Sequence, residues 1–65
     1  MTGQKRREDM IQTIKKSEKP ISGHILAQKY EISRQVIVQD IALLRAEGYD
    51  IISTNKGYVM HGIKN

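Results

Sequence analysis

The sequence predicts an α+β fold in which three helices with a short strand are followed by a C-terminal two-stranded β-hairpin. Before Gly48, apolar residues recur at helical spacing in three segments, as in helices that bury one face. After Gly48, β-branched and aromatic residues flank a short polar turn, as in a hairpin. The 65 residues are enough for one small core, so we expect residues 1–65 to form a single domain.

The first predicted helix covers about residues 4–17. Its narrow apolar stripe consists of Met10, Ile11 and Ile14. Pro20 stops this helix, because proline lacks an amide hydrogen and disfavours helical geometry in the residue before it. Between this proline and Ser22, Ile21 has room for only the short strand.

Two further helices are predicted at about residues 23–30 and 34–47. Ser22 and Ser33 each precede one of them, where a serine hydroxyl accepts hydrogen bonds from amides of the first turn. Gly48 suits the left-handed residue that ends a helix. Because so few residues separate these two helices, they form a helix-turn-helix.

The helix at about 34–47 has two contrasting faces. At about 100° per residue, one stripe contains Ile37, Ile41 and Leu44. The opposite face contains Gln35, Gln39 and Ala42, with Val38 at its margin. One face that packs on a core and one that stays free are typical of a recognition helix that enters the major groove of DNA.

The hairpin is expected at about residues 49–60. Thr54-Asn55-Lys56-Gly57 supplies its turn, with glycine at the position that needs a positive φ. The side chains expected to face the helices are Tyr49, Ile51, Tyr58 and Met60. A hairpin beside a helix-turn-helix is a wing, so the complete prediction is a winged helix-turn-helix.

The composition favours a polyanionic partner. Lys and Arg outnumber Asp and Glu by 11 to 7, which gives a formal net charge of +4. Cations stand at the start of the first helix (Lys5-Arg6-Arg7), at the start of the recognition helix (Arg34) and at the hairpin tip (Lys56). Cations at these three places can reach phosphates, and the alternative interpretation is an ordinary solvated surface.

Four residues are candidates for contacts with DNA bases: Arg34, Gln35, Val38 and Gln39. Glutamine can form two hydrogen bonds with adenine, arginine can do the same with guanine, and valine can contact the thymine methyl group. Each residue also has an ordinary interpretation as an exposed helix residue. Their common position away from the apolar stripe favours base contact.

Six further residues are candidates for contacts with the DNA backbone: Ser22, Gly23, His24, Ser33, Asn55 and Lys56. The first four lie at helix N-termini, where free amide groups attract phosphate oxygens. The last two lie at the hairpin tip, from which a cation can approach the backbone or the minor groove. The histidine is the weakest candidate, because a lone histidine is most often an exposed neutral side chain.

Other function classes lack the residues they need. The chain has no cysteine, no glycine-rich phosphate loop and no carboxylate pair spaced for acid–base catalysis, so we expect neither an enzyme nor a cofactor. His24 and His61 are too far apart in the sequence to indicate a metal site. No apolar run approaches the roughly 20 residues of a membrane-spanning helix, so we expect no membrane association and a cytoplasmic location.

Five segments carry a resemblance to a known family: Pro20-Ile21-Ser22-Gly23, Leu26-Ala27, the run from Ile32 to Ile41, Leu44-Arg45 and Gly57-Tyr58. Over residues 6–60 the chain resembles the N-terminal winged helix-turn-helix domain of the niacin-responsive transcriptional repressors. The resemblance implies binding to double-stranded DNA and repression of genes of NAD and niacin metabolism. In that family a further domain with three histidines binds a metal and nicotinic acid.

The resemblance concerns the DNA-binding domain alone. We expect the ligand-binding, metal-binding and dimerising domain of the family to be absent from these 65 residues, and neither His24 nor His61 to be one of its metal ligands. The 65 residues are therefore expected to be largely monomeric and to bind one half-site weakly. Tethering two such binders raises avidity by roughly 10² to 10⁴ without any new contact.

Two alternatives remain open. A winged helix can serve as a protein-interaction module without specific DNA binding, and Val38, Ala42 and Leu43 are then an apolar docking patch. RNA recognition needs exposed aromatic rings for stacking, and Tyr49 is the one candidate. Binding through several phosphates weakens steeply as salt rises, whereas apolar docking is much less sensitive, so a salt titration separates DNA binding from protein docking.

Overall fold

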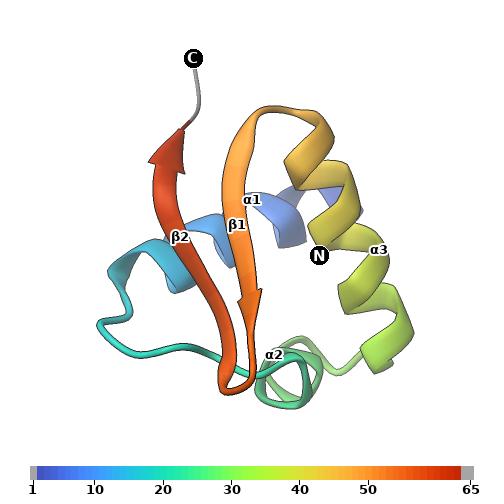
Figure 1. The fold of residues 1–65 in the computed structure, drawn as a ribbon. Helices are drawn as coiled ribbons and strands as arrows, with labels where there is room; N and C mark the ends of the chain where they lie inside the picture. The colour runs from blue at the N-terminus through green and yellow to red at the C-terminus, as the bar shows by residue number, and fades with distance from the viewer. Residues whose placement is uncertain (1, 64–65) are drawn as a thin grey trace.

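The computed structural model describes residues 2–63 and confirms the predicted winged helix-turn-helix fold (Figure 1). Its elements are α1 (Gly3–Lys16), α2 (Gly23–Tyr30), α3 (Arg34–Ala46), β1 (Tyr49–Thr54) and β2 (Gly57–Ile63). In Figure 1 the hairpin lies in front of α1, α3 runs along one side of it, and α2 lies beside the hairpin turn. Compared with the expected ranges, α1 and α3 each end one residue earlier, and β2 extends past residue 60.

Side-chain caps set the first residue of each helix. The hydroxyl groups of Thr2, Ser22 and Ser33 each accept a hydrogen bond from the amide three residues further on. The two serine caps confirm the sequence analysis. The threonine cap was not predicted, and it makes α1 begin at Gly3.

Residues with left-handed backbone end the two helices of the helix-turn-helix. Gly48 has a φ of 105° after α3, as predicted. Glu31 ends α2 with a φ of 55°, which few residues other than glycine adopt. Across this residue the Ile32 amide donates to the Ala27 carbonyl oxygen at 3.0 Å, as in a Schellman motif. The chain therefore turns sharply into α3.

One hydrophobic core joins the helices to the hairpin. Its buried residues are Met10, Ile11, Ile14, Leu26, Ala27, Ile37, Ile41, Leu44 and Ile51. Half-buried residues packed against it are Ile21, Tyr30, Ile32, Tyr49, Tyr58 and Met60. The apolar stripe of α3 faces this core, so the glutamine face of the same helix faces outward.

The sheet is the hairpin itself. Its strands are antiparallel, with Ile52 opposite Val59 and a bulge between Tyr49 and Ile51. Ile51 is buried in the core whereas the neighbouring Ile52 is 39% exposed, as the alternation of a strand requires. The inner face of the hairpin thus closes a core that the three helices leave open.

Two hydrogen bonds fasten the hairpin to the segment before α2. The Ile21 amide donates to the Tyr58 carbonyl oxygen at 3.1 Å, and the Tyr58 amide donates to the Ile21 carbonyl oxygen at 2.7 Å. This isolated antiparallel bridge occupies the place of the predicted short strand. Gly57 permits it, because a Cβ there would lie 2.5 Å from the Ile21 oxygen and 2.6 Å from the Ser22 nitrogen.

Candidate nucleic-acid interface

The outward side of α3 carries exposed polar and small apolar side chains. We call Gln35, Val38, Gln39 and Ala42 the readout face; all four are exposed, and Val38 keeps 52% of its surface accessible. Ile37 and Ile41, on the other side of the same helix, are buried in the core. An α-helix fits the major groove of B-DNA, so this face can approach base edges without disturbing the core.

α3 also carries a buried charge that the sequence analysis did not single out. Asp40 is 2% exposed, and its carboxylate accepts hydrogen bonds from Arg6 Nε at 2.6 Å, Arg6 Nη2 at 3.1 Å and Arg7 Nη1 at 3.4 Å. The hydrogen bond to Asp40 raises the pKa of Arg6 above its ordinary value, although partial burial opposes this. We call these three residues the Asp40 cluster.

The structure thus binds Arg6 and Arg7, two of the cations considered for phosphate contact, to a carboxylate of the same chain. Both guanidinium groups are bound to Asp40, and the two side chains are only 18% and 25% exposed. A buried carboxylate needs such partners, because an uncompensated buried charge is strongly destabilising. The sequence contained a signal for this arrangement. At about 100° per residue, Asp40 lies only about 60° from Ile37, so an acidic residue borders the buried stripe.

A second group of residues gathers where the hairpin turn meets the starts of α2 and α3. We call it the hairpin edge, and it consists of Ser22, Gly23, Arg34, Asn55 and Lys56, which all line one surface hollow. Arg34 extends across the start of α2, since its Cγ and Nε lie 3.6 Å from the point that a Cβ on Gly23 would occupy. The structure thus places Arg34, a predicted base contact, among the predicted backbone contacts.

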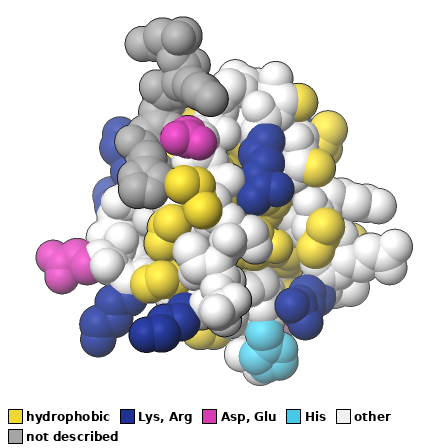
Figure 2. Space-filling view, viewed as in Figure 1, with side chains coloured by type: hydrophobic (Ala, Val, Ile, Leu, Met, Phe, Trp, Pro, Cys, Tyr) yellow, Lys and Arg dark blue, Asp and Glu magenta, His cyan; other side chains and the backbone are white. Residues whose placement is uncertain are grey.

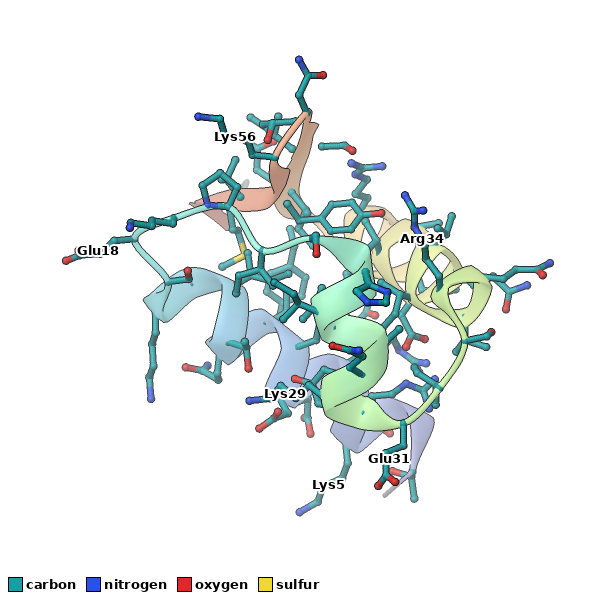
Figure 3. The ribbon with its side chains drawn as sticks, turned by 90° about the horizontal axis from the view of Figure 1, so that it is seen from below. Lys5, Glu18, Lys29, Glu31, Arg34 and Lys56 are labelled. Carbon is teal, nitrogen blue, oxygen red and sulfur yellow. The ribbon has the colours of Figure 1, made fainter. Side chains whose placement is uncertain are left out.

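The cations of the hairpin edge are available to a ligand. Among the described side chains of residues 2–60, no ion pair joins Arg34 or Lys56 to an acidic residue. In Figure 3 both lie on the hairpin side of the molecule, whereas Lys29 and Glu31 lie on the opposite side. Lys and Arg side chains border the lower end of the face in Figure 2, and one acidic side chain projects beside them at the lower left.

The other two predicted backbone contacts lie close to these surfaces but outside the hollow. His24 is exposed in the first turn of α2, next to Gly23, and is not among the residues that line the hollow. The Ser33 hydroxyl is occupied as a cap, because it accepts a hydrogen bond from the Val36 amide at 3.3 Å. Ser33 remains exposed at the start of α3.

A hydrogen-bond network holds α2 against α1. The Tyr30 hydroxyl donates to Asp9 Oδ2 at 2.6 Å and lies 3.2 Å from Thr13 Oγ1. Partial burial, supported by the hydrogen bond to Asp9, raises the pKa of Tyr30 to about 12. Tyr30 therefore stays a neutral hydrogen-bond donor at physiological pH. The sequence analysis did not identify this network.

A further side chain fixes the hairpin to α3. Arg45 Nε donates to the Ile51 carbonyl oxygen at 2.9 Å, near the C-terminus of α3. The hairpin is therefore attached at two places, to α3 through Arg45 and to the start of α2 through the bridge between Ile21 and Tyr58. These attachments hold the hairpin edge and the readout face in a fixed relative position.

The surfaces needed by the two alternatives are less continuous. Val38 and Leu43 are 52% and 49% exposed, but their spacing places them about 140° apart around α3, so they do not share one patch. Tyr49, the stacking candidate for RNA, packs half-buried against the core. In contrast, the readout face and the hairpin edge combine polar side chains and cations at adjoining positions.

Membrane-spanning helices and metal clusters are both missing from the described part of the chain. Within residues 2–63, no helix has the length and apolar composition needed to cross a membrane. The side chains described also contain no group of three His, Cys, Asp or Glu residues that could hold a metal ion. The side chain of His61 lies outside the described residues.

A helix-turn-helix with an outward polar face on its second helix, followed by a hairpin with cations beside it, defines a winged helix-turn-helix domain. Comparison with protein families agrees, because residues 6–59 match the family described as "HTH domain". The chain belongs to this helix-turn-helix family.

Two curated relatives are similar along almost the whole chain. It is 47% identical over 62 residues to the "Probable transcription repressor NiaR" of Thermotoga maritima, covering 95% of this chain and 35% of that protein. It is 48% identical over 59 residues to the "Transcription repressor NadR" of Bacillus subtilis, covering 91% of this chain and 33% of that protein. The chain thus spans about a third of the length of these relatives. The resemblance to the helix-turn-helix domain of these repressors is confirmed.

Proposed function

We propose that this chain binds double-stranded DNA in a sequence-specific manner and thereby represses transcription. In this proposal α3 lies in the major groove, the readout face contacts base edges, and the hairpin edge contacts phosphates of the adjoining backbone. Two similar proteins are named as transcription repressors. The target genes are those implied by the resemblance, namely genes of NAD and niacin metabolism, and the domain acts in the cytoplasm, where such genes are transcribed.

The observation that carries the proposal is the continuity between the two surfaces. Arg34 opens α3, one residue before the readout face begins at Gln35, and it also lines the hollow of the hairpin edge. A helix placed in the groove therefore brings Arg34 and Lys56 to its border, where the phosphates lie. Contacts with phosphates fix the register of a protein on the duplex, and contacts with base edges provide specificity.

Each residue has a role that follows from its chemistry. Gln35 and Gln39 are one helical turn apart and are assigned to adenine, and Val38 is assigned to the methyl group of thymine. Ser22 stands at a helix start, where free amides attract a phosphate oxygen, whereas Gly23 beside it is buried; Lys56 offers its charge. The position of Arg34 over the start of α2 supports a phosphate contact in addition to the guanine contact that the first turn of α3 allows.

A binding experiment tests this proposal. A preferred duplex is selected by the chain from a library of randomised duplexes, and its affinity is compared with that of a scrambled duplex, single-stranded DNA and RNA at two salt concentrations. We expect the selected duplex to bind most tightly and all duplex affinities to fall steeply with salt, with a log–log slope of about −0.9 for each phosphate neutralised. Equal affinity for every nucleic acid, or binding that does not respond to salt, would contradict the proposal.

A further inference from the structure

We propose that the Asp40 cluster is the positioning element of the recognition helix. In this role Arg6 fixes the rotation and axial position of α3 on α1 through Asp40, and so determines which base edges the readout face meets. The consequence for DNA selectivity rests on the proposed function, whereas the effect on the orientation of α3 does not.

The contact between Arg6 and Asp40 is directional, unlike the apolar contacts of α3. The buried stripe of α3 is aliphatic, and hydrophobic contacts are non-directional, so they tolerate small rotations and shifts of a helix. In contrast, two nitrogens of one planar guanidinium meet two oxygens of one carboxylate, at 2.6 and 3.1 Å. Such a two-point contact specifies orientation as well as distance.

The position of Asp40 in the sequence transmits this constraint to the readout face. Asp40 directly follows Gln39 in the same helix, so a displacement of the carboxylate moves Gln39 with it. Arg6 lies near the start of α1, which the Thr2 cap fixes. A binding group must be held within about 0.5 Å and 10–20° of its working geometry, so a small rotation of α3 is enough to misalign Gln39.

Stability alone explains the Asp40 cluster poorly. A buried ion pair is often no more stabilising than apolar residues of the same volume, because removing the charges from water is costly. Its best supported use is to select one arrangement among several that pack equally well. Here the second arginine, Arg7, adds a contact at 3.4 Å to the same carboxylate oxygen as Arg6 Nη2, so the carboxylate is held from two successive positions of α1.

Two variants separate the geometry of the contact from its charge. Asp40→Asn keeps the size of the side chain but removes the carboxylate, and Arg6→Lys keeps the positive charge but cannot form the two-point contact. Glu47→Gln is the matched control, because it removes one exposed acidic charge from the end of α3, in a hollow that Arg7 also lines, but none of the hydrogen bonds of the Asp40 cluster. Each variant is studied well below its unfolding temperature, so that the fraction of folded protein does not limit binding.

The first measurement is the ratio of the affinities for the selected and the scrambled duplex. We expect Asp40→Asn and Arg6→Lys to lower this ratio by about tenfold, which corresponds to about 1.4 kcal/mol. The affinity for the scrambled duplex should not fall in either variant, and Glu47→Gln should keep the ratio of the parent chain. A ratio unchanged in both cluster variants, or lost equally in Glu47→Gln, would overturn the proposal.

The second measurement uses the free protein and needs no DNA. Residual dipolar couplings of backbone amides should show α3 reoriented relative to α1 in both cluster variants, while α2 keeps its orientation through Tyr30 and Asp9. If Asp40→Asn does not fold, the residual dipolar couplings of Arg6→Lys alone show whether α3 changes its orientation relative to α1. An unchanged α3 refutes the positioning role, whatever the chain binds. A reoriented α3 with no preferred duplex refutes the proposed function and leaves the positioning role intact.

Discussion

The cations on the two sides of α3 have opposite surroundings. On the α1 side, Arg6 and Arg7 are bound to a carboxylate that is 2% exposed. On the hairpin side, Arg34 and Lys56 line a surface hollow, and none of the acidic side chains described in residues 2–60 forms an ion pair with them. A buried carboxylate within reach decides whether a basic side chain holds the fold together or stays available to a polyanion.

This difference changes how the net charge of +4 should be interpreted. The formal charge counts every Lys and Arg alike, although Arg6 and Arg7 already share the carboxylate of Asp40. An estimate of phosphate contacts from the sequence alone therefore counts too many. In the structure, the candidates for phosphate contacts are the cations near the readout face that have no acidic partner among the described side chains.

Gly57→Ala should have the largest effect, because it disrupts the bridge between Ile21 and Tyr58 that attaches the hairpin to the start of α2. The new Cβ would meet the backbone of Ile21 and Ser22, and the φ of 138° is one that alanine rarely adopts. We expect the free energy of unfolding to fall by about 3 kcal/mol in urea denaturation. Gly23→Ala is the control, since its Cβ would make only ordinary contacts at 3.5 and 3.6 Å. Equal losses in both variants would show that the close approach at Gly57 is unimportant.

Gln39→Ala should have the next largest effect, and it acts on selectivity rather than on stability. Removing this side chain from the readout face deletes base contacts without changing the charge, so the affinity for the selected duplex should fall by roughly 1–3 kcal/mol. Binding to a scrambled duplex should stay nearly the same. Both affinities can be measured by fluorescence anisotropy. Equal weakening on the two duplexes would show that Gln39 does not contact a base.

Lys56→Ala and Arg7→Gln test directly whether the cations on the two sides of α3 differ in their access to DNA. Each variant removes one positive charge from a different side of this helix. With a scrambled duplex, Lys56→Ala should reduce the magnitude of the salt slope by about 1, because one phosphate contact is lost. Arg7→Gln should leave the slope unchanged, because Arg7 is bound to Asp40. If the two variants lower the slope equally, the two groups of cations do not differ in their access to DNA.

Tyr30→Phe should have the smallest effect, and it is visible only in alkali. The raised pKa of about 12 means that folded Tyr30 keeps its proton between pH 10 and 12, where the unfolded chain loses it. The stabilisation is therefore complete below about pH 10 and is lost as the pH rises through about 12. Denaturation at several pH values should show that the parent chain's excess free energy of unfolding over Tyr30→Phe falls by about 1 kcal/mol across this range. The change is this small because solvent reaches the hydroxyl and weakens the effect. A constant advantage would contradict this assignment.

The features that the sequence predicted are those set by neighbouring residues. The serine caps at Ser22 and Ser33 depend on amides only three residues away, and the buried stripe of α3 follows from its own periodicity. Both could be derived without knowing how the elements pack. For the same reason the order of three helices and a hairpin was predictable from local patterns.

The features that the sequence analysis missed depend on packing between distant segments. Arg6 and Asp40 are far apart in the chain, and nothing in the first helix alone distinguishes an arginine that binds a carboxylate from one that binds a phosphate. Likewise, the turn required glycine at position 57 for its φ, but its close approach to Ile21 appears only when the hairpin meets the segment before α2. The grouping of Arg34 with the hairpin tip has the same origin.

The two hydrogen bonds between Ile21 and Tyr58 also have an entropic consequence. Many DNA-binding segments become ordered only on the duplex, and that ordering reduces the affinity. Here these two hydrogen bonds, at 2.7 and 3.1 Å, order the backbone beside the hairpin turn when the chain folds. The conformational entropy of that backbone is therefore lost before DNA binds. Association then restricts mainly the exposed side chains of Asn55 and Lys56. A rigid wing of this kind favours rapid docking as a preformed body over slow adjustment on the duplex.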